Sequence, residues 1–316
     1  MHVGVGKMRL GRLVCASLGA GLLVALGTSL PAHAAFPGSN GRLAFQREVP
    51  AGDHTQTDIY TIRPDGSGLT RLTATPNRNE FGPAWNAAGT RIAFWRTRAP
   101  FGPGSIWVMD AHGHHQKQLT HGFDARDPAW NPAGTRIVFT RAEKGNFDLW
   151  TMRASDGGGL RRLTSGAALD FEPAWSPGGT RVAFTRGFQQ GDVGDIYILN
   201  LKSGRLTHVT RSAAYDHQVA WAPSGKRLVF ERDGSASSSI FAVNADGAHL
   251  ARLTRGPFFD IGPSFSPDGR YIAFGSDRGR EVLDDLWVMK ANGSNLHRVR
   301  LLPFSEGVPD WQPLPR

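Results

Sequence analysis

The sequence predicts an all-β fold, a six-bladed β-propeller with four antiparallel strands per blade. An aromatic residue, in three repeats within Pro-Ala-Trp, recurs about every 45 residues, which is the length expected of one four-stranded blade. A turn containing Pro and Gly then precedes a second apolar run, as a β-hairpin requires. The chain enters the repeat at a second strand and ends after a first strand, so its two ends should complete one blade and close the ring. The repeat aromatics are Trp85, Trp130, Trp175, Trp221, Phe265 and Trp311.

Each repeat contains four short runs in which apolar and polar residues alternate, the pattern of half-buried strands. The first run carries the repeat aromatic. The second ends at Phe45, Phe94, Phe139, Phe184, Phe230 and Phe274. The third is marked by Tyr60, Trp107, Trp150, Tyr197, Phe241 and Trp287. The fourth is marked by Leu72, Leu119, Leu163, Val209, Leu253 and Val299. We expect the aromatics to pack between blades rather than to stack on a ligand.

Residues 1–34 have the features of a secretory signal peptide. A basic start is followed by an apolar run from Leu13 to Leu30 and by the small-residue sequence Ala32-His33-Ala34. The alternative is a retained membrane anchor. The single cysteine, Cys15, lies inside this apolar run, so the mature chain should be free of disulfides. We therefore expect one propeller domain over residues 35–316, exported to the periplasm or secreted, with no membrane span in the mature chain.

The chain is basic, with a formal net charge of +9. Many of its arginines occupy one fixed repeat position after the hairpin turn, so their charge should be spread around the ring rather than gathered in a stripe. This pattern argues against nucleic-acid binding, and a monomer is expected. These arginines are Arg42, Arg91, Arg136, Arg181, Arg227 and Arg270.

The repeat resembles the Pro-Asp-type, WD-like repeat of the TolB-like β-propeller family. The motif appears as Pro-Ala-Trp-Ser-Pro-Gly-Gly-Thr-Arg-Val-Ala-Phe at 173–184 and as Pro-Ser-Phe-Ser-Pro-Asp-Gly-Arg-Tyr-Ile-Ala-Phe at 263–274. Asp-Ile-Tyr or Asp-Leu-Trp on the third strand, followed by Arg-Leu-Thr, strengthens the likeness. The resemblance covers residues 36–316. It implies a propeller that binds other proteins in the cell envelope.

An acidic residue and an arginine recur at positions that hairpin pairing places opposite each other. The acids stand five residues before the repeat aromatic, at Glu80, Asp170, Asp216, Asp260 and Glu306, with Ala125 in the remaining blade. The arginines stand two residues after the second-strand phenylalanine, at Arg47, Arg96, Arg141, Arg186 and Arg232. Register therefore predicts a structural acid–Arg clasp in most blades. A free carboxylate ring that binds a cation is the alternative.

Asp260 is expected to be the exception, because Ser276 occupies the position of its arginine. The loops that leave each second strand and enter each first strand open on one side, here called the rim face, and they vary most in length and content. Loops of this kind usually carry binding function. We therefore predict a rim-face binding site for a cation or a basic partner segment at Phe258, Phe259, Asp260, Asp277, Asp284 and Asp285.

Enzymatic function has weaker support in the sequence. There is no Gly-x-Ser-x-Gly nucleophile motif. His112, His114 and His115 fall in a turn on the opposite face, here called the turn face, where a solvated turn is favoured over a metal site. We expect no catalytic residue, no metal and no cofactor. The predicted function is non-catalytic binding of an envelope or extracellular protein or peptide; the alternatives are a polysaccharide-acting lyase or hydrolase and a glycan-binding propeller.

Overall fold

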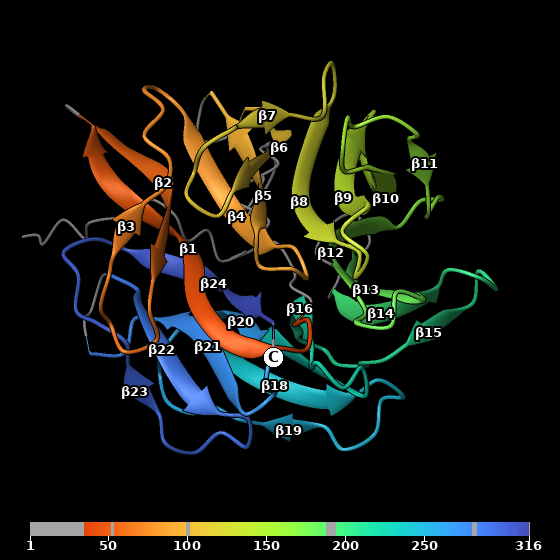
Figure 1. Ribbon diagram of the computed structural model, residues 1–316. Coiled ribbons are helices and arrows are strands. Elements are labelled where there is room, and N and C mark those ends of the chain that lie inside the picture. Colours follow the sequence, from red (N-terminus) through yellow and green to blue (C-terminus); the bar gives the residue numbers. More distant parts are fainter. Residues whose placement is uncertain (1–34, 52–53, 99–101, 188–193, 280–282, 316) are drawn as a thin grey trace, which may run out of the picture.

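The structure, a computed structural model, confirms the six-bladed propeller (Figure 1). It describes residues 35–51, 54–98, 102–187, 194–279 and 283–315. The predicted signal peptide and Cys15 lie outside these residues. Within them, every blade is a four-stranded antiparallel sheet, and no helix has the length and apolar character needed to cross a membrane.

The strands follow the order that the repeat predicts. The innermost strands are β4 (Asn79–Trp85), β8 (Asp124–Trp130), β12 (Leu169–Trp175), β16 (Tyr215–Trp221), β20 (Asp260–Phe265) and β24 (Glu306–Leu314). The second strands are β1 (Ser39–Ala51), β5 (Arg91–Thr97), β9 (Arg136–Glu143), β13 (Arg181–Gly187), β17 (Arg227–Asp233) and β21 (Tyr271–Ser276). The third strands are β2 (His54–Ile62), β6 (Ser105–Asp110), β10 (Asn146–Arg153), β14 (Asp195–Asn200), β18 (Ser238–Asn244) and β22 (Asp285–Lys290). The outermost strands are β3 (Thr70–Arg71), β7 (Lys117–Gln118), β11 (Arg161–Arg162), β15 (Leu206–His208), β19 (Ala251–Arg252) and β23 (His297–Arg298).

Blades are numbered from the one that the two ends of the chain share. Blade 1 is β24-β1-β2-β3, and blades 2 to 6 follow in chain order from β4. In blade 1 the last strand pairs with the first strand of the chain, with Trp311 opposite Leu43. Hydrogen bonds between strands distant in sequence therefore close the ring, as predicted.

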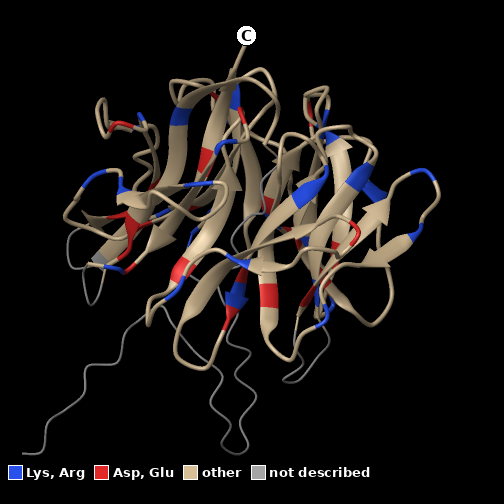
Figure 2. Ribbon diagram, turned by 90° about the horizontal axis from the view of Figure 1, so that it is seen from below, with Lys and Arg blue, Asp and Glu red and all other residues tan. Residues whose placement is uncertain are grey.

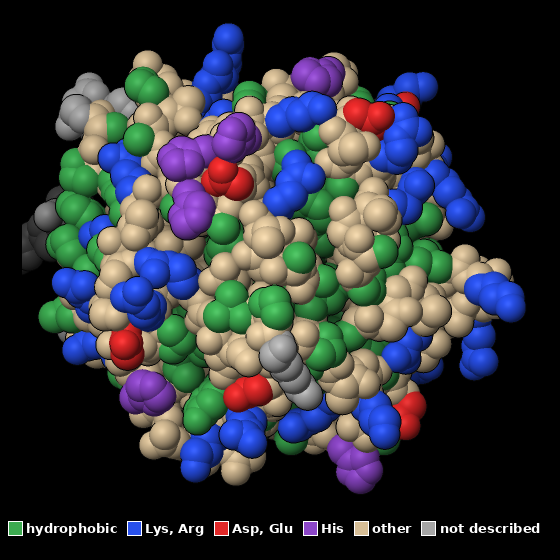
Figure 3. Space-filling view, in the orientation of Figure 1, with side chains coloured by type: hydrophobic (Ala, Val, Ile, Leu, Met, Phe, Trp, Pro, Cys, Tyr) green, Lys and Arg blue, Asp and Glu red, His purple; other side chains and the backbone are tan. Residues whose placement is uncertain are grey.

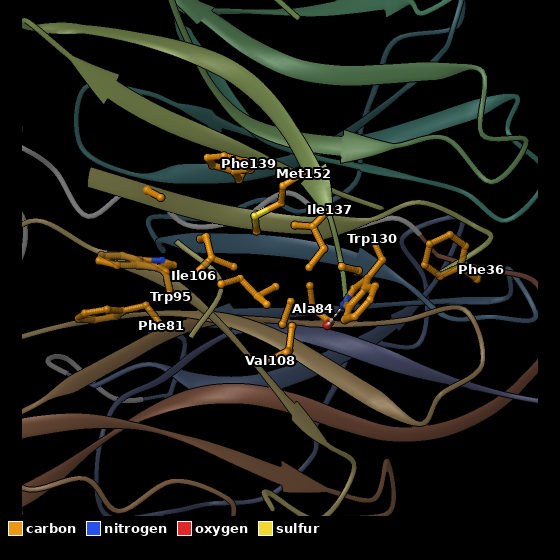
Figure 4. Packing of buried hydrophobic residues seen from close by; sticks show 14 residues of the cluster. Phe36, Phe81, Ala84, Trp95, Ile106, Val108, Trp130, Ile137, Phe139 and Met152 are labelled. Carbon is orange, nitrogen blue, oxygen red and sulfur yellow. Dashed lines mark hydrogen bonds between the residues drawn. The ribbon is translucent and has the colours of Figure 1, made fainter. Parts of the chain in front are cut away.

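Buried aromatic residues join neighbouring blades. Phe139, Trp130, Ala84 and other apolar side chains of blades 2 and 3 form one cluster (Figure 4). Within it, the indole Nε1 of Trp130 donates a 3.0 Å hydrogen bond to the carbonyl of Ala84 in the preceding blade. Trp221 repeats this bond to Ala174 at 3.1 Å. The repeat tryptophan thus supplies apolar contact area and, in these two blades, a hydrogen bond to the neighbouring blade.

Asp310 ties the closing strand to the blades on both sides. It occupies the position before the repeat aromatic, where the other blades have Ala or Ser. Its Oδ2 accepts a 2.7 Å hydrogen bond from the Trp85 amide of blade 2, and its Oδ1 accepts one of 3.3 Å from the Ser264 hydroxyl of blade 6. Burial raises the pKa of this carboxyl to about 7, although these hydrogen bonds favour its ionised form.

We expect Asp310→Asn to change how stability depends on pH. A raised pKa in the folded state means that the contribution of Asp310 is fully present below pH 4 and is lost as the pH rises toward 7. Asparagine can accept the Trp85 hydrogen bond with its amide oxygen and donate its NH2 group to the Ser264 hydroxyl, and it does not ionise. In urea unfolding, the variant should therefore gain stability relative to the wild type between pH 4 and pH 8. A difference that stays constant over this range would contradict the assignment.

Each inner strand contains a β-bulge, three residues before its repeat aromatic, at a residue in the left-handed region. The register of the inner hairpin shifts there, for example between Phe171 and Ala174. The bulge residues are Gly82, Asp127, Glu172, Gln218, Gly262 and Val308, with φ between 52° and 57°. Such a bulge changes the direction of side chains. Here the carboxylate of Glu172 points toward the next blade, where it accepts a 2.9 Å hydrogen bond from the backbone amide of Gln218.

The segment Ala35–Gly38 crosses the central channel. The amide of Ala35 donates to the carbonyl of Trp221 in blade 5 at 3.3 Å, and that of Gly38 donates to Pro267 in blade 6 at 3.3 Å. Phe36 is buried in the cluster of blades 2 and 3 that contains Trp130 (Figure 4). Contacts with blades on opposite sides of the ring place this segment in the middle of the channel, at its turn-face end.

Candidate functional site

The acid and the arginine lie together in the blades where register pairs them. The Nε–carboxylate distances are 2.7 Å for Arg96–Glu80, 2.6 Å for Arg186–Asp170, 2.5 Å for Arg232–Asp216 and 3.6 Å for Arg47–Glu306. The acids are almost fully buried, with side chains at most 1% exposed. Charges removed from water in this way need a close partner. We interpret these pairs as structural.

In every blade, an arginine at this end also lies over the aromatic of the third strand. The pairs are Arg47–Tyr60, Arg96–Trp107, Arg141–Trp150, Arg186–Tyr197, Arg232–Phe241 and Arg278–Trp287, with distances to the ring centre of 4.3 to 5.8 Å. The third-strand aromatics are therefore covered by protein cations, an arrangement worth about 0.5–1 kcal/mol per pair at exposed sites.

The expectation that Asp260 lacks an arginine is wrong. Arg278, two residues beyond the predicted position, donates to both carboxylate oxygens of Asp260, and the Ser276 hydroxyl donates to Oδ1 at 2.6 Å. The strand β21 ends at Ser276, and the following turn brings the side chain of Arg278 back over the acid. Register along a strand could not predict a partner that comes from beyond its end.

The other residues of the predicted rim site lie at the same end of blade 6 but have structural contacts. Asp285 is buried and pairs with Arg298 at 3.2 Å. Asp277 accepts a 2.8 Å hydrogen bond from the amide of Phe259, and the amide of Asp284 donates to the Ser305 hydroxyl at 3.2 Å. The structure therefore brings the predicted residues together without assembling an open group of carboxylates.

Three phenylalanines occupy equivalent positions on the rim face. Phe258 in blade 6, Phe304 in blade 1 and Phe123 in blade 3 are each half-buried. Arginines lie over their rings at 4.9, 5.8 and 4.3 Å respectively. Phe258 and Phe304 stand in adjacent blades, so part of the rim face is aromatic as well as polar.

A second group of titratable side chains lies at the rim-face end of blade 5 and was not predicted. His217 on β16 stands opposite Glu231 on β17. Its Nε2 lies 3.6 Å from Oε1 of Glu231 and 3.5 Å from Oδ2 of Asp233, and its Nδ1 lies 3.8 Å from Oε1 of Glu172 in blade 4. The side chain of Asp233 is 45% exposed, whereas that of Glu231 is 4% exposed. We call these four residues the His217 cluster.

The charges in the His217 cluster depend on one another. Burial lowers the pKa of His217, but the charge of Glu231 and the contacts with Asp233 and Glu172 outweigh it, and the pKa lies well above its usual range. Burial raises the pKa of Glu231, opposed by the charge of His217. Three carboxylates thus surround one imidazole. The cluster can therefore hold one positive charge in a largely buried place.

A comparison of the repeats could have found this cluster. At the position of Glu231, the other blades have Gln46, Trp95, Thr140, Thr185 and Gly275, none of which is charged. The contribution of Glu172 could not have been found in this way. It depends on the bulge that directs this side chain across the blade boundary.

The turn-face histidines form a separate group. His112, His114 and His115 surround Asp110, whose Oδ2 lies 2.8 Å from Nδ1 of His115. The imidazoles of His114 and His115 are 73% and 88% exposed. The amides of His112 and His114 donate to Asp110 at 2.9 Å. Asp110 therefore organises the turn, which fits the favoured interpretation of a solvated turn.

Charged residues are spread around the ring. Figure 2 shows Lys, Arg, Asp and Glu interspersed over the strands and loops. On the face turned to the viewer in Figure 3, basic side chains lie mainly toward the edge, while hydrophobic side chains gather nearer the centre. Neither view shows the continuous basic stripe that nucleic-acid binding would favour.

Comparison with known proteins confirms the TolB-like propeller. Residues 187–314 match the TolB beta propeller domain, and no curated protein sequence matches the chain. Among solved structures, TolB from Acinetobacter baumannii is 20% identical with a TM-score of 0.74, and the match covers 86% of this chain and 67% of that one. A chain of the nidogen/laminin complex gives 12% identity, 87% and 99% coverage and a TM-score of 0.67. Oligogalacturonate lyase in complex with manganese is 12% identical with a TM-score of 0.53, and the match covers 85% of this chain and 75% of that one.

Proposed function

On the premise that the chain carries a TolB-like β-propeller, we propose that it is a non-catalytic binding module for a protein partner and acts outside the cytoplasmic membrane. The proposed location rests on the signal-peptide features of residues 1–34. The proposed partner is an extended protein segment with apolar side chains. It docks on the rim face.

The observation that carries this proposal is the pair of half-buried phenylalanines on adjacent blades, Phe258 and Phe304. Aromatic residues and arginines are enriched where proteins meet, and each of these rings has an arginine against it, Arg278 or Arg47. Both arginines are held by buried acids. A surface fixed in this way loses little side-chain entropy when a partner binds.

A cross-linking pull-down from an envelope extract of the producing cells tests this proposal. We expect one specific protein to be captured by the wild-type chain and captured at least tenfold less by the double variant Phe258→Ser, Phe304→Ser. The matched control is Phe123→Ser, which changes the same repeat position in blade 3 and should retain capture. Capture that is equal in all three, or lost equally in both variants, would contradict a docking site on blades 6 and 1.

The proposal also requires that the protein bind without turnover. The purified chain should release no products from envelope polysaccharides over many hours. Turnover that persists after purification to homogeneity would instead support the polysaccharide-acting alternative.

A further inference from the structure

We propose that the His217 cluster is a binding site for a divalent transition-metal ion of the zinc or manganese kind, with His217, Glu231 and Asp233 as its protein ligands. This site would be distinct from the protein-docking surface on blades 6 and 1. It does not depend on that surface being used.

The distances between the three ligand groups fit an ion better than they fit direct hydrogen bonds. One ligand atom from each residue lies within 4.8 Å of the other two. The separations of 3.5 and 3.6 Å between His217 Nε2 and the two carboxylates are long for hydrogen bonds. They agree with the spacing of about 3.3–3.6 Å between tetrahedral ligands that each lie about 2.0–2.2 Å from a shared ion.

The imidazole Nε2 is the second observation that points to a ligand. It is buried, and within the described residues it makes no hydrogen bond. A buried polar atom without a hydrogen bond destabilises a protein by about 1–3 kcal/mol, so this one calls for an explanation. Coordination to an ion between Glu231 and Asp233 provides it.

Groups around the ligands hold them in place. Oε2 of Glu231 accepts a 3.2 Å hydrogen bond from the Gly262 amide of blade 6, so the other oxygen, Oε1, is the one turned to His217. On the other side of the imidazole, Nδ1 of His217 faces Glu172. Oε2 of Glu172 accepts hydrogen bonds of 2.9 Å from the Thr185 hydroxyl and the Gln218 backbone amide. A carboxylate behind a coordinating histidine is the usual arrangement in metal sites, because it fixes the imidazole orientation.

The chemistry of the donors selects the class of ion. One imidazole nitrogen with two carboxylates suits zinc or manganese better than calcium or magnesium, which prefer oxygen ligands alone. Asp233 is 45% exposed, so one side of the site faces solvent. Three protein ligands and an open side leave room for water or for an oxygen atom of another molecule.

Calorimetric titration of the purified full chain with Zn²⁺ and with Mn²⁺ tests the proposal. We expect one tight equivalent of at least one of the two ions, with binding weakened at least tenfold in Asp233→Asn and in His217→Asn. Asp233→Asn is the safer variant, because this side chain is the most exposed of the three. The folded state of each variant is checked by circular dichroism.

The turn-face histidines provide the matched control. Exposed imidazoles can hold zinc without a built site, so the double variant His114→Ala, His115→Ala should lose any weak second equivalent and keep the tight one. A tight equivalent that disappears with this control and survives in Asp233→Asn and His217→Asn would overturn the proposal. So would the absence of tight binding of either ion by a folded wild-type chain.

Discussion

Replacing Arg186 with alanine should destabilise the protein by about 3–5 kcal/mol, because it leaves a buried carboxylate without its cation. The guanidinium forms two hydrogen bonds with Asp170, of 2.6 and 2.8 Å. The side chain of Asp170 is 1% exposed and that of Arg186 is 13% exposed. Neither water nor another side chain can therefore readily replace the contact that Asp170 loses. Equilibrium urea unfolding at pH 7 measures the effect.

Two further variants show whether the loss comes from the buried charge. Arg161→Ala removes an exposed arginine from the outermost strand β11 and should change stability by less than about 0.5 kcal/mol. The double variant Asp170→Asn, Arg186→Met removes both charges and should recover a large part of the loss. A loss below about 1 kcal/mol in Arg186→Ala would mean that the clasp contributes little.

Gly157→Ala should lower the free energy of unfolding by about 3 kcal/mol, because the turn that contains Gly157 lies directly against the neighbouring blade. Gly157 follows β10 in blade 3, has a φ of +75°, and any Cβ atom at this position would collide with the carbonyl oxygen of Leu119 in blade 2. A left-handed alanine costs about 1–2 kcal/mol by itself, and relieving the collision requires the two blades to move apart. Thermal and urea unfolding should both show the loss.

Blade 4 provides the control for this prediction. Gly204 stands in the equivalent turn with a φ of +71°, and no other atom lies within 4 Å of the place that a Cβ atom would take there. Gly204→Ala should therefore show only the backbone cost, about 1–2 kcal/mol. Equal losses in the two variants would show that contact between blades does not determine the cost at Gly157.

The fold could be predicted from the sequence because the same strand and turn motif recurs in every blade. Six copies of one motif fix the strand order, and the incomplete first and last repeats predict the shared blade that Leu43 and Trp311 form. Hairpin register also predicts which acid faces which arginine, as Asp170 and Arg186 show. The acid–arginine pairing depends on contacts within one repeat, where spacing along the chain determines spacing in the sheet.

The site features that were missed depend on departures from this regularity. Arg278 reaches Asp260 from a turn beyond the end of its strand, so pairing along the strand does not predict the contact. Glu172 reaches His217 because a bulge residue in the left-handed region turns its side chain toward the next blade. Sequence spacing does not reveal a bulge when the residue is Glu rather than Gly.

The segment Ala35–Gly38 in the channel affects how quickly a bound molecule could be exchanged. Because this segment crosses the turn-face end, a ligand that occupied the channel would have to enter and leave through the rim-face end. A competing molecule could not enter from the opposite end, so the bound molecule would have to leave before the second could bind. Dissociation of the first occupant would then limit the rate of replacement, however abundant the second is.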